Sequence, residues 1–411
     1  MNENHSNTEW IYRKRLIGPK VREIFRDFPA VVISGARQVG KSTFLLEEFP
    51  DFHYLTLDDF STLEQAKIDP FSLWMGKEKV IIDEAQRSPE ILSAVKMTID
   101  RQKGVRFLIS GSADLLLMKG VSESLAGRAI YLKMYPMLYS EVRGETDLLK
   151  RWENLWENGA TIREEKAIDP LPYIFRGFMP PLLFIKEEEK VPLFWESYVR
   201  TYLERDLREL SQIESIVDFR RVLAAFALRS GNLLNQTEIA RDTGVSQPTV
   251  SRYLKILEVS HLVERVYSYH KSRTKRIVKS PKLFFADPGL CVYLTGYYNV
   301  QALSSARELG SFFETGVFLH LKVLSELLTP KAQLYYLRTT EGKEVDFVLE
   351  HGPRLAALEV KCTDRPLLSM AKNLIAFVEE HPKTFGILIH KGGMIGRFHS
   401  RVLALPWWYL A

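Results

Sequence analysis

The sequence predicts an α/β protein in which a parallel sheet with flanking helices is followed by a helical region and a second, C-terminal α/β domain. Short apolar, β-branched segments alternate with helical patterns from residue 30 to about residue 143. That alternation is typical of a parallel sheet covered by helices. Helical patterns then dominate the middle of the chain, and strand and helix patterns alternate again from about residue 309.

Composition predicts a globular protein with several domains. The chain has 411 residues, of which 46% are hydrophobic and 26% charged, so two to four domains are expected. No apolar run approaches the roughly 18 residues that a membrane helix needs, and the N-terminus lacks the pattern of a signal peptide, so we expect a cytoplasmic protein without a membrane partner. Cys291 and Cys362 lie too far apart in the sequence for a CxxC zinc pair. A net charge of +5 does not by itself indicate a nucleic-acid partner.

Five apolar segments are predicted as the strands of the first sheet: 31–34, 52–57, 80–83, 106–110 and 129–132. A charged stretch at 145–168 and a Pro/Gly-rich segment at 176–183 follow them and mark the exit from the first domain. We therefore predict a P-loop ATPase domain at 1–144, a helical lid and connector at 145–230, a winged helix-turn-helix at 231–300, and a nuclease-like domain at 301–411.

A phosphate-binding loop follows the first predicted strand. The segment from Gly35 through Gly40, Lys41 and Ser42 fits the pattern GxxxxGK(S/T), and Thr43 begins a helical pattern directly after it. Glycines let backbone N–H groups surround phosphates, and the helix N-terminus adds positive charge. Lys41 is expected to reach the β- and γ-phosphates and Ser42 to ligate Mg²⁺, which predicts ATP and Mg²⁺ as cofactors.

Two carboxylates end the predicted strand at 80–83. Three β-branched residues precede Asp83 and Glu84, so the strand is expected to be buried and its acidic end to face the phosphate site. Asp83 would hold the Mg²⁺ shell and Glu84 would act as the catalytic base on the attacking water. The alternative is that these two acids form an ordinary acidic turn after a core strand. The phosphate-binding loop and the acidic strand end occur in the order typical of an ATPase, with one additional predicted strand between them, and this order favours the ATPase interpretation.

Three further residues are candidates for the same site. Ser110 and Ser112 follow a later apolar strand, where a hydroxyl could sense the γ-phosphate, and helix capping by Ser112 is the alternative. Arg128 lies in a loop, where it could act as a catalytic arginine finger on a neighbouring subunit. That role predicts a homo-oligomer, and a solvated loop arginine is the alternative.

These motifs together resemble a known family. The segments VVISGARQVGKST, YLTLDD, VIIDEAQ, FLISGSA and SLAGR, with a later match at 200–206, resemble the bacterial and archaeal AAA-type ATPases of the AAA_14/DUF4143 architecture. The resemblance spans most of the chain and implies nucleoside triphosphate binding, whereas it leaves the biological role open.

A helix-turn-helix pattern occupies residues 235–254. Gly244 marks the turn, Ser246 is the expected N-cap, and Gln247, Thr249 and Arg252 would lie at the exposed start of the second helix, where they could contact DNA. Strand-like segments at 262–269 and 282–286 then bracket the five cations of a predicted wing: Lys271, Arg273, Lys275, Arg276 and Lys279. This concentration predicts DNA phosphate contacts, with a protein-binding module or a solvated loop as alternatives.

The C-terminal pattern resembles the PD-(D/E)XK nuclease fold. It consists of Glu314 on a helix, Asp346 on a strand, and Glu359 and Lys361 on the next strand, where alternation puts the last two on one face. Asp346 and Glu359, with Glu314, are candidate Mg²⁺ ligands, and Lys361 could orient the attacking water. Retention of the fold as a nucleic-acid-binding shell without cleavage is the alternative.

We therefore expect an ATP-binding, ATP-hydrolysing AAA-type protein that acts on DNA by binding, remodelling or cleaving it. The alternatives are an ATP-dependent protein-binding switch, or a DNA-binding regulator with an inactive nuclease-like domain.

Overall fold

The computed structural model describes residues 11–102, 104–111, 125–206, 213–270, 272, 276, 279–339 and 342–410. Two compact units divide the chain. Unit 1 comprises Met1–Met137 with Met179–Glu187, and unit 2 comprises Leu138–Phe178 with Glu188–Ala411. The predicted division into four domains remains a prediction.

Unit 1 contains a five-stranded parallel sheet with the order β2-β3-β4-β1-β5. Its strands are β1 (Ala30–Ser34), β2 (His53–Thr56), β3 (Lys79–Asp83), β4 (Arg106–Gly111) and β5 (Ala129–Lys133). The predicted α/β class and the five predicted strands are confirmed. Because β4 lies between β1 and β3, the end of β4 is placed beside both the phosphate-binding loop and the acidic end of β3.

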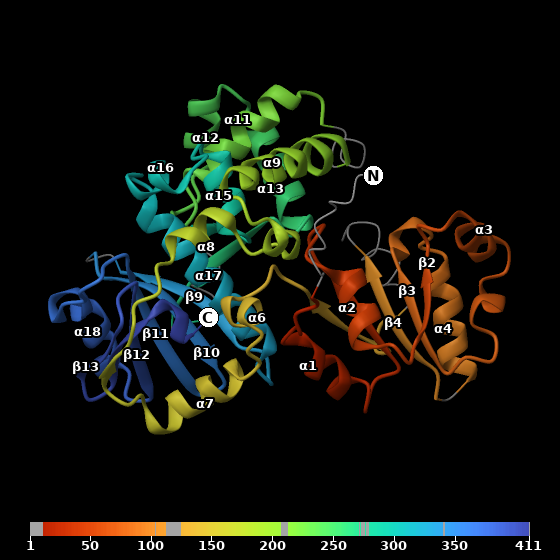
Figure 1. Cartoon of the computed structure of the whole chain (residues 1–411), viewed down its shortest axis with the longest axis horizontal. Helices are drawn as coiled ribbons and strands as arrows, with labels where there is room; N and C mark the ends of the chain where they lie inside the picture. The colour runs from red at the N-terminus through yellow and green to blue at the C-terminus, as the bar shows by residue number, and fades with distance from the viewer. Residues whose placement is uncertain are drawn as a thin grey trace, which may run out of the picture. The chain divides into compact units, whose positions relative to one another are not determined.

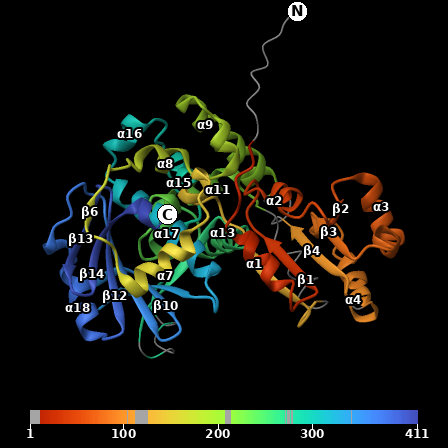
Figure 2. The same cartoon turned by 60° about the horizontal axis from the view of Figure 1, so that its bottom comes forward.

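Four α-helices cover this sheet, and Figures 1 and 2 show them on its two faces. They are α1 (Ile17–Ile24), α2 (Lys41–Glu48), α3 (Phe60–Ile68) and α4 (Ile91–Arg101). Alternate strand residues such as Val32, Val80 and Phe107 pack with Ile91 and Val95 of α4 in one buried cluster. Burial of both sheet faces explains why the strands are almost continuously apolar.

Unit 2 is built on a nine-stranded mixed sheet with the order β6-β13-β14-β12-β11-β10-β9-β7-β8. Its strands are β6 (Arg163–Glu164), β7 (Val263–Ser268), β8 (Lys282–Phe285), β9 (Gln333–Arg338), β10 (Glu344–His351), β11 (Arg354–Lys361), β12 (Thr384–His390), β13 (Met394–His399) and β14 (Val402–Pro406). The sequence predicted a second sheet in the C-terminal region. It did not predict that this sheet would also include the earlier strands β6, β7 and β8.

The helices of unit 2 precede, connect and cover this sheet. They are α6 (Tyr139–Arg143), α7 (Leu148–Asn158), α8 (Leu171–Arg176), α9 (Val191–Tyr198) with a π-helical continuation at Val199–Asp206, α11 (Ile216–Ala227), α12 (Gln236–Thr243), α13 (Gln247–Val259), α15 (Pro288–Leu294), α16 (Val300–Ser304), α17 (Leu309–Leu327) and α18 (Lys372–Glu380). Leu374, Phe377 and Val378 of α18 pack on the sheet with Val348 and Leu388. On α17, Phe318 stacks on Phe284 of β8 at 4.5 Å between ring centroids, so α17 lies against β8.

The helix-turn-helix forms as two helices joined at Gly244, which has a left-handed backbone with φ of 70°. Ser246 caps α13 by accepting a hydrogen bond from the Thr249 N–H, and Val250 and Leu254 are buried as the spacing predicts. Strands β7 and β8 then pair antiparallel, and β7 also pairs in parallel with β9 at Tyr267 and Tyr335. The two strands that follow the helix pair therefore belong to the same sheet as the C-terminal strands, while the designation as a winged helix remains a prediction.

Within the residues that the model describes, no helix is both long and apolar enough to cross a membrane.

Candidate active site

The phosphate-binding loop connects β1 to α2 through backbone that only glycine adopts easily. A Cβ at Gly35 would lie 2.3 Å from the carbonyl oxygen of Met134, so no larger residue fits there without moving the chain. Gly40 is the N-cap of α2 and has φ of 89°, in the left-handed region that disfavours residues with a Cβ. The loop is thus shaped by its two glycines for close backbone approach to a ligand.

Lys41 is buried at the start of α2, with 5% of its surface exposed. Its ammonium donates hydrogen bonds to the carbonyl oxygens of Gly35 at 2.9 Å and Ala36 at 3.0 Å. These contacts hold the side chain across the loop, beside the N–H groups that open α2. A cation and a helix N-terminus therefore converge where an anionic phosphate would bind.

Asp83 ends β3 and is the centre of a buried hydrogen-bond network, with 1% of its surface exposed. Its Oδ1 accepts from the Ser110 hydroxyl and, at 3.0 Å, from the Glu84 N–H. Its Oδ2 accepts from the Tyr54 hydroxyl at 2.7 Å. Ser110 thus donates to Asp83 and orients that carboxylate, while its predicted role as a γ-phosphate sensor remains a prediction.

Tyr54 was missed in the sequence, where it reads as an ordinary residue of strand β2. Burial, together with its hydrogen bond to Asp83, raises the pKa of the Tyr54 phenol, so it stays a proton donor at neutral pH. The Ser42 hydroxyl also interacts with this phenol. The side chains of both predicted Mg²⁺ ligands, Ser42 and Asp83, therefore interact with the Tyr54 hydroxyl.

Glu84 follows β3 in a left-handed conformation, with φ of 56° and ψ of 40°. A non-glycine residue seldom adopts this backbone, and such residues cluster at functional sites. Its Oε2 accepts a hydrogen bond from the Gln86 side-chain amide. The carboxylate of Glu84 is thus bonded by Gln86, whereas that of Asp83 is bonded by Tyr54, Ser110 and the Glu84 N–H.

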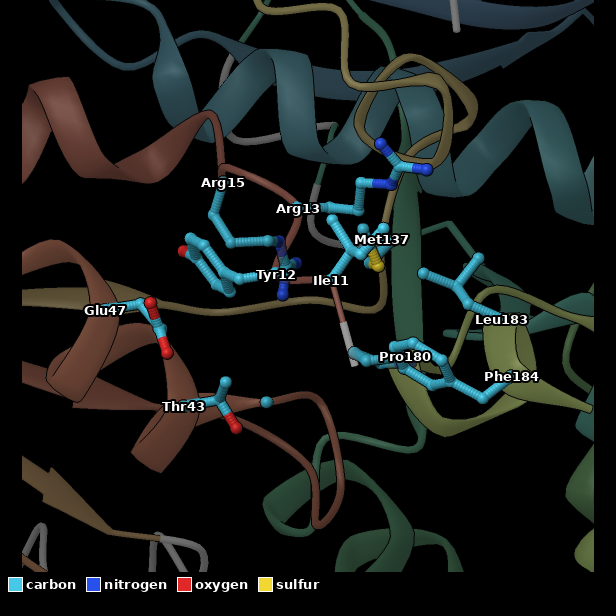
Figure 3. A pocket seen from close by; sticks show the side chains of 11 residues that line it. Ile11, Tyr12, Arg13, Arg15, Thr43, Glu47, Met137, Pro180, Leu183 and Phe184 are labelled. Carbon is cyan, nitrogen blue, oxygen red and sulfur yellow. The ribbon is translucent and has the colours of Figure 1, made fainter. Parts of the chain in front are cut away.

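A pocket of about 150 Å³ lies within unit 1 beside the phosphate-binding loop. Figure 3 shows that its walls come from the N-terminal segment, α2 and the turn at 180–184. The lining residues are Ile11, Tyr12, Arg13, Arg15, Gly40, Thr43, Glu47, Met137, Pro180, Leu183 and Phe184. This mixture of apolar and hydrogen-bonding groups, continuous with Gly40 and Thr43, is suited to a flat aromatic group attached to a phosphate chain.

Arg15 connects the pocket to the phosphate-binding loop. It is buried, and its guanidinium donates to the Val39 carbonyl at 2.8 Å and the Tyr135 carbonyl at 2.7 Å. Because Val39 directly precedes Gly40, these bonds join the loop to the segment that follows β5. No motif marks Arg15 in the sequence.

Arg128, the predicted arginine finger, is partly exposed and forms a two-point ion pair with Asp100 of α4. The distances are 2.6 Å from Nε to Oδ1 and 3.0 Å from Nη2 to Oδ2. The pair raises the pKa of Arg128 and lowers that of Asp100. Arg128 is thus held within its own unit in this structure, and Ser112 lies outside the described residues.

The predicted DNA-contacting residues of α13 differ in their surroundings. Gln247 is exposed, and the Thr249 hydroxyl is hydrogen-bonded to the Ser246 cap at 2.9 Å. Arg252 stacks over Tyr253 and lies 3.5 Å from a carboxylate oxygen of Glu214. Its side chain is 40% exposed, so it remains available at the surface of α13.

Arg276 departs from the expected cationic wing. Its guanidinium forms a two-point ion pair with Glu350 at 2.6 and 3.0 Å and lies over the rings of Tyr269 and Tyr335, 4.9 and 4.7 Å from their centroids. Its side chain is only 10% exposed and its charge is paired in this structure, while its role in DNA contact remains a prediction. Lys279 donates to the Arg338 carbonyl, and Lys271, Arg273 and Lys275 lie outside the described residues.

The C-terminal candidates gather in one cluster of buried and partly exposed side chains, which we call the carboxylate cluster: Glu314, Glu344, Asp346, Glu359, Lys361 and Lys282. The ladder between β9 and β10 shifts register between Val345 and Val348, and this irregularity carries Asp346. Asp346 accepts from the Val360 N–H at 2.8 Å, and Lys361 contacts Glu359 at 2.6 Å. Lys282 of β8 was not predicted to take part.

Burial dominates the electrostatics of this cluster. It raises the pKa of Glu314 to about 8 and that of Glu359 to about 7, and the negative charge of Asp346 adds to both shifts. Burial also raises the pKa of Asp346, while Lys282 and Lys361 oppose that shift. The carboxylates in turn raise the pKa of Lys282 against the effect of its own burial. Among the described residues, no three Asp, Glu, His or Cys side chains are grouped so as to hold a metal ion.

Three family models match the chain, in the same order as its regions. An AAA domain matches residues 27–143, a domain of unknown function (DUF8612) matches 170–301, and a second domain of unknown function (DUF4143) matches 309–410. Uncharacterized proteins of Mycobacterium bovis and Mycobacterium tuberculosis are each 30% identical over 364 residues, which is 87% of this chain and 76% of theirs. The chain belongs to the AAA_14/DUF4143 family.

The chain is also similar to more distant proteins. An uncharacterized protein of Methanocaldococcus jannaschii is 24% identical over 77% of this chain and 71% of its own. Among solved structures, a Walker-type ATPase of Pyrococcus abyssi is similar, with 16% identity, a TM-score of 0.44, and coverage of 69% of this chain and 96% of its own. The family model and the parallel sheet identify the AAA_14/DUF4143 protein as one with an AAA-type, ATPase-like domain.

Proposed function

We propose that this AAA_14/DUF4143 protein binds ATP with Mg²⁺ in unit 1, hydrolyses it, and uses the reaction in work on DNA. The observation that carries the ATPase proposal is the network around Asp83. Residues from β2, β3 and β4 meet there, beside the loop that holds Lys41. A buried carboxylate at the end of a central strand, next to a phosphate-binding loop, is the arrangement that P-loop ATPases use.

The residues have separate roles in this proposal. Lys41 and the N–H groups that open α2 bind the phosphates, and Thr43 lies on the same turn of the helix. Ser42 and Asp83 would hold Mg²⁺, which when bound neutralises phosphate charge. Glu84 accepts a proton from the attacking water, because it follows Asp83 at the end of the strand beside the phosphate-binding loop. The pocket with Tyr12 and Pro180 takes the base.

Two variants test the ATPase proposal. Glu84→Gln is expected to bind ATP with unchanged affinity and to lose most turnover, because the amide cannot accept the proton from water. Lys41→Ala is expected to lose binding as well, since the phosphates lose their cation. ATP affinity from fluorescence titration and phosphate release under saturating ATP separate the two effects. A fully active Glu84→Gln protein contradicts the role of Glu84.

The proposed DNA-binding surface is the exposed face of α13, with Gln247, Thr249, Ser251 and Arg252. Gln247 and Ser251 are exposed and Thr249 and Arg252 are half-buried, and polar groups at the start of the second helix of helix-turn-helix proteins meet the major groove. The basic residues Lys271, Arg273 and Lys275 follow in the sequence and add positive charge for phosphate contacts.

DNA-stimulated ATP hydrolysis is the deciding measurement for this part of the proposal. Duplex, single-stranded and branched DNA are compared for their effect on turnover, and retention on DNA is measured at low salt. Ser251→Glu is expected to weaken DNA binding by charge repulsion, whereas Ser304→Glu, the same change at an exposed serine of α16, is not. ATP turnover that no DNA changes, with no retention, favours a protein-binding switch instead.

The proposed role of Arg128 requires that the protein acts as a homo-oligomer. We propose that Arg128 leaves Asp100 and completes the ATP site of a neighbouring subunit, because an exposed arginine can exchange one carboxylate for a phosphate. Mixing two inactive variants, Arg128→Ala and Lys41→Ala, tests this. Partial recovery of activity in the mixture indicates a finger that acts between subunits, and no recovery contradicts it.

The carboxylate cluster supports a nuclease-like module that does not cleave DNA in the present arrangement. Glu314, Asp346, Glu359 and Lys361 lie together, but cleavage by such a site needs a divalent cation, and Lys282 lies among the same carboxylates. Cleavage of DNA by the wild-type protein with Mg²⁺ or Mn²⁺, lost in Glu359→Ala, contradicts this assignment and establishes a nuclease.

A further inference from the structure

The pocket beside the phosphate-binding loop has an apolar end and a polar end. Pro180, Leu183 and Phe184 contribute aliphatic and aromatic groups to the apolar end. Figure 3 shows Thr43 and Glu47, both carried by α2, across the pocket from Leu183 and Phe184. Glu47 is the single carboxylate among the described residues that line the pocket. Its position therefore decides which part of a bound nucleotide would meet a negative charge.

Glu47 lies one turn beyond Thr43 on the same face of α2. Because four positions separate the two residues, Glu47 is about 6 Å farther along the helix axis from the phosphate-binding loop. Thr43 belongs to the first turn of α2, where the N–H groups of a helix bind phosphates. In a nucleoside triphosphate the sugar follows the last phosphate, and the base lies beyond the sugar. Glu47 is therefore placed beside the sugar when the base occupies the apolar end.

The Glu47 carboxylate has no partner within the described part of the chain. The residue is exposed, and no hydrogen bond or ion pair joins its carboxylate to another described residue. Glu48, the next residue of α2, differs, because its carboxylate accepts from Tyr12 and pairs with Arg22. An ionised carboxylate only accepts hydrogen bonds, and each ribose hydroxyl can donate one. Glu47 is thus suited to the sugar, whereas it would repel a phosphate.

We propose that Glu47 binds the ribose of the nucleotide by accepting hydrogen bonds from its hydroxyls, and that this contact selects ribonucleotides. The inference rests on the proposed binding of ATP in unit 1 and adds the residue that recognises the sugar. A nucleotide without ribose hydroxyls displaces water from the carboxylate and returns no donor, which lowers its affinity. The phosphates and the base keep their contacts, so the selection depends on the sugar alone.

Calorimetric titration of the full chain with ATP and with dideoxy-ATP, which lacks both ribose hydroxyls, tests this inference in the presence of Mg²⁺. We expect the wild type to bind ATP about tenfold more tightly, because dideoxy-ATP loses hydrogen bonds to a charged group. In Glu47→Ala the two affinities should become equal, chiefly through weaker binding of ATP. Glu47→Gln should keep part of the difference, because its amide oxygen still accepts a hydrogen bond.

Glu64→Ala is the matched control. Glu64 is an exposed glutamate of α3 in the same unit, and it does not line the pocket. The variant removes the same charge and should retain the difference in affinity that the wild type shows. A loss of discrimination in Glu64→Ala equal to that in Glu47→Ala overturns the inference, because net charge alone would then account for the effect.

Purine riboside triphosphate, which lacks the exocyclic amine of adenine, separates the sugar from the base. Its affinity relative to that of ATP should be the same in the wild type and in Glu47→Ala, because the carboxylate contacts the sugar. If Glu47→Ala changes this ratio and leaves the ratio for dideoxy-ATP unchanged, the carboxylate accepts from the base and the inference is wrong.

Failure of the inference and failure of the proposed function give different results. Equal binding of ATP and dideoxy-ATP by the wild type overturns the inference alone, whereas no binding of either nucleotide overturns both. Thermal unfolding separates a structural role from recognition, because Glu47→Ala should melt at the same temperature as the wild type. A lower melting temperature with an equal loss of affinity for both nucleotides indicates a structural role and overturns the inference.

Discussion

The hydroxyl of Tyr54 donates a 2.7 Å hydrogen bond to Oδ2 of Asp83. Tyr54 lies on β2 and Asp83 ends β3, and the register of these parallel strands puts Tyr54 opposite Ile81. With Ser110 and the Glu84 N–H on the other oxygen, both oxygens of the carboxylate are held in place. A residue without a recognisable motif therefore orients the predicted magnesium ligand.

Removal of this hydrogen bond is expected to weaken Mg·ATP binding. Partners that orient a metal ligand change metal affinity by about tenfold or more when they are lost, so Tyr54→Phe should raise the Mg²⁺ concentration for half-maximal turnover by about tenfold. Tyr131→Phe, at a partly exposed position of β5, should leave it unchanged. Mg²⁺ titrations of ATP turnover distinguish the two, and equal curves for Tyr54→Phe and wild type would contradict an orienting role.

Arg15 is expected to stabilise the phosphate-binding loop. In Arg15→Met, the buried carbonyls of Val39 and Tyr135 lose their donor, which should lower the free energy of unfolding by about 1–3 kcal/mol. ATP affinity should fall too, because the loop before Gly40 loses its support. Chemical denaturation and ATP titration measure both effects. Arg13→Met, at an exposed arginine of the same segment, should leave the free energy of unfolding unchanged.

Gly177 is expected to tolerate no side chain. It ends α8 with φ of 83°, and a Cβ there would lie 2.3 Å from Asp287 Oδ1 and 2.9 Å from the Trp195 ring. Gly177→Ala should therefore lower the free energy of unfolding by about 2–4 kcal/mol through backbone strain and overlap. Gly310→Ala in α17, where no atom lies within 4 Å, should be neutral or slightly stabilising. Thermal unfolding compares the two variants.

Acid is expected to destabilise unit 2 through His320. The Tyr139 N–H donates to Nε2 of His320, the Gly316 carbonyl lies 2.6 Å from Nδ1, and burial lowers the pKa of this imidazole to about 4. The unfolded chain takes up the proton near pH 6.5, so it binds more protons than the folded chain between the two pKa values. The contribution of neutral His320 to the free energy of unfolding is fully present above pH 6.5. It is lost as the pH falls toward 4, and the loss is at most about 3 kcal/mol.

His320→Gln provides the comparison for this pH dependence, because its amide does not titrate. The variant should show a shallower loss of stability between pH 6.5 and 4 in denaturant unfolding, whatever its stability at pH 7. Burial also lowers the pKa of His390 to about 4. His390 therefore adds the same pH-dependent loss of stability to the wild type and to the variant. An identical slope in the two proteins would show that His320 is not the titrating group.

Local sequence patterns were sufficient where a property depends on neighbouring residues. The strand at Val80–Asp83, the turn at Gly244 and the cap at Ser246 are set by β-branched runs, by left-handed backbone and by a side-chain acceptor. Arg276 shows the limit of such reasoning. Its place among other cations predicted an exposed wing, but Glu350, 74 positions later, pairs with it. Sequence proximity carries no information about such a distant partner.

The sequence by itself determined the α/β class, the phosphate-binding loop and the segments that form the strands of the first sheet, because these depend on periodicity and on residues that are close in the chain. Only the tertiary structure decided which side chains meet. It placed Tyr54 and Ser110 on Asp83, joined β7 and β8 to the C-terminal sheet, and put Lys282 among the carboxylates of α17 and β10. Each contact depends on strand order and helix packing, which bring together residues that no local pattern connects.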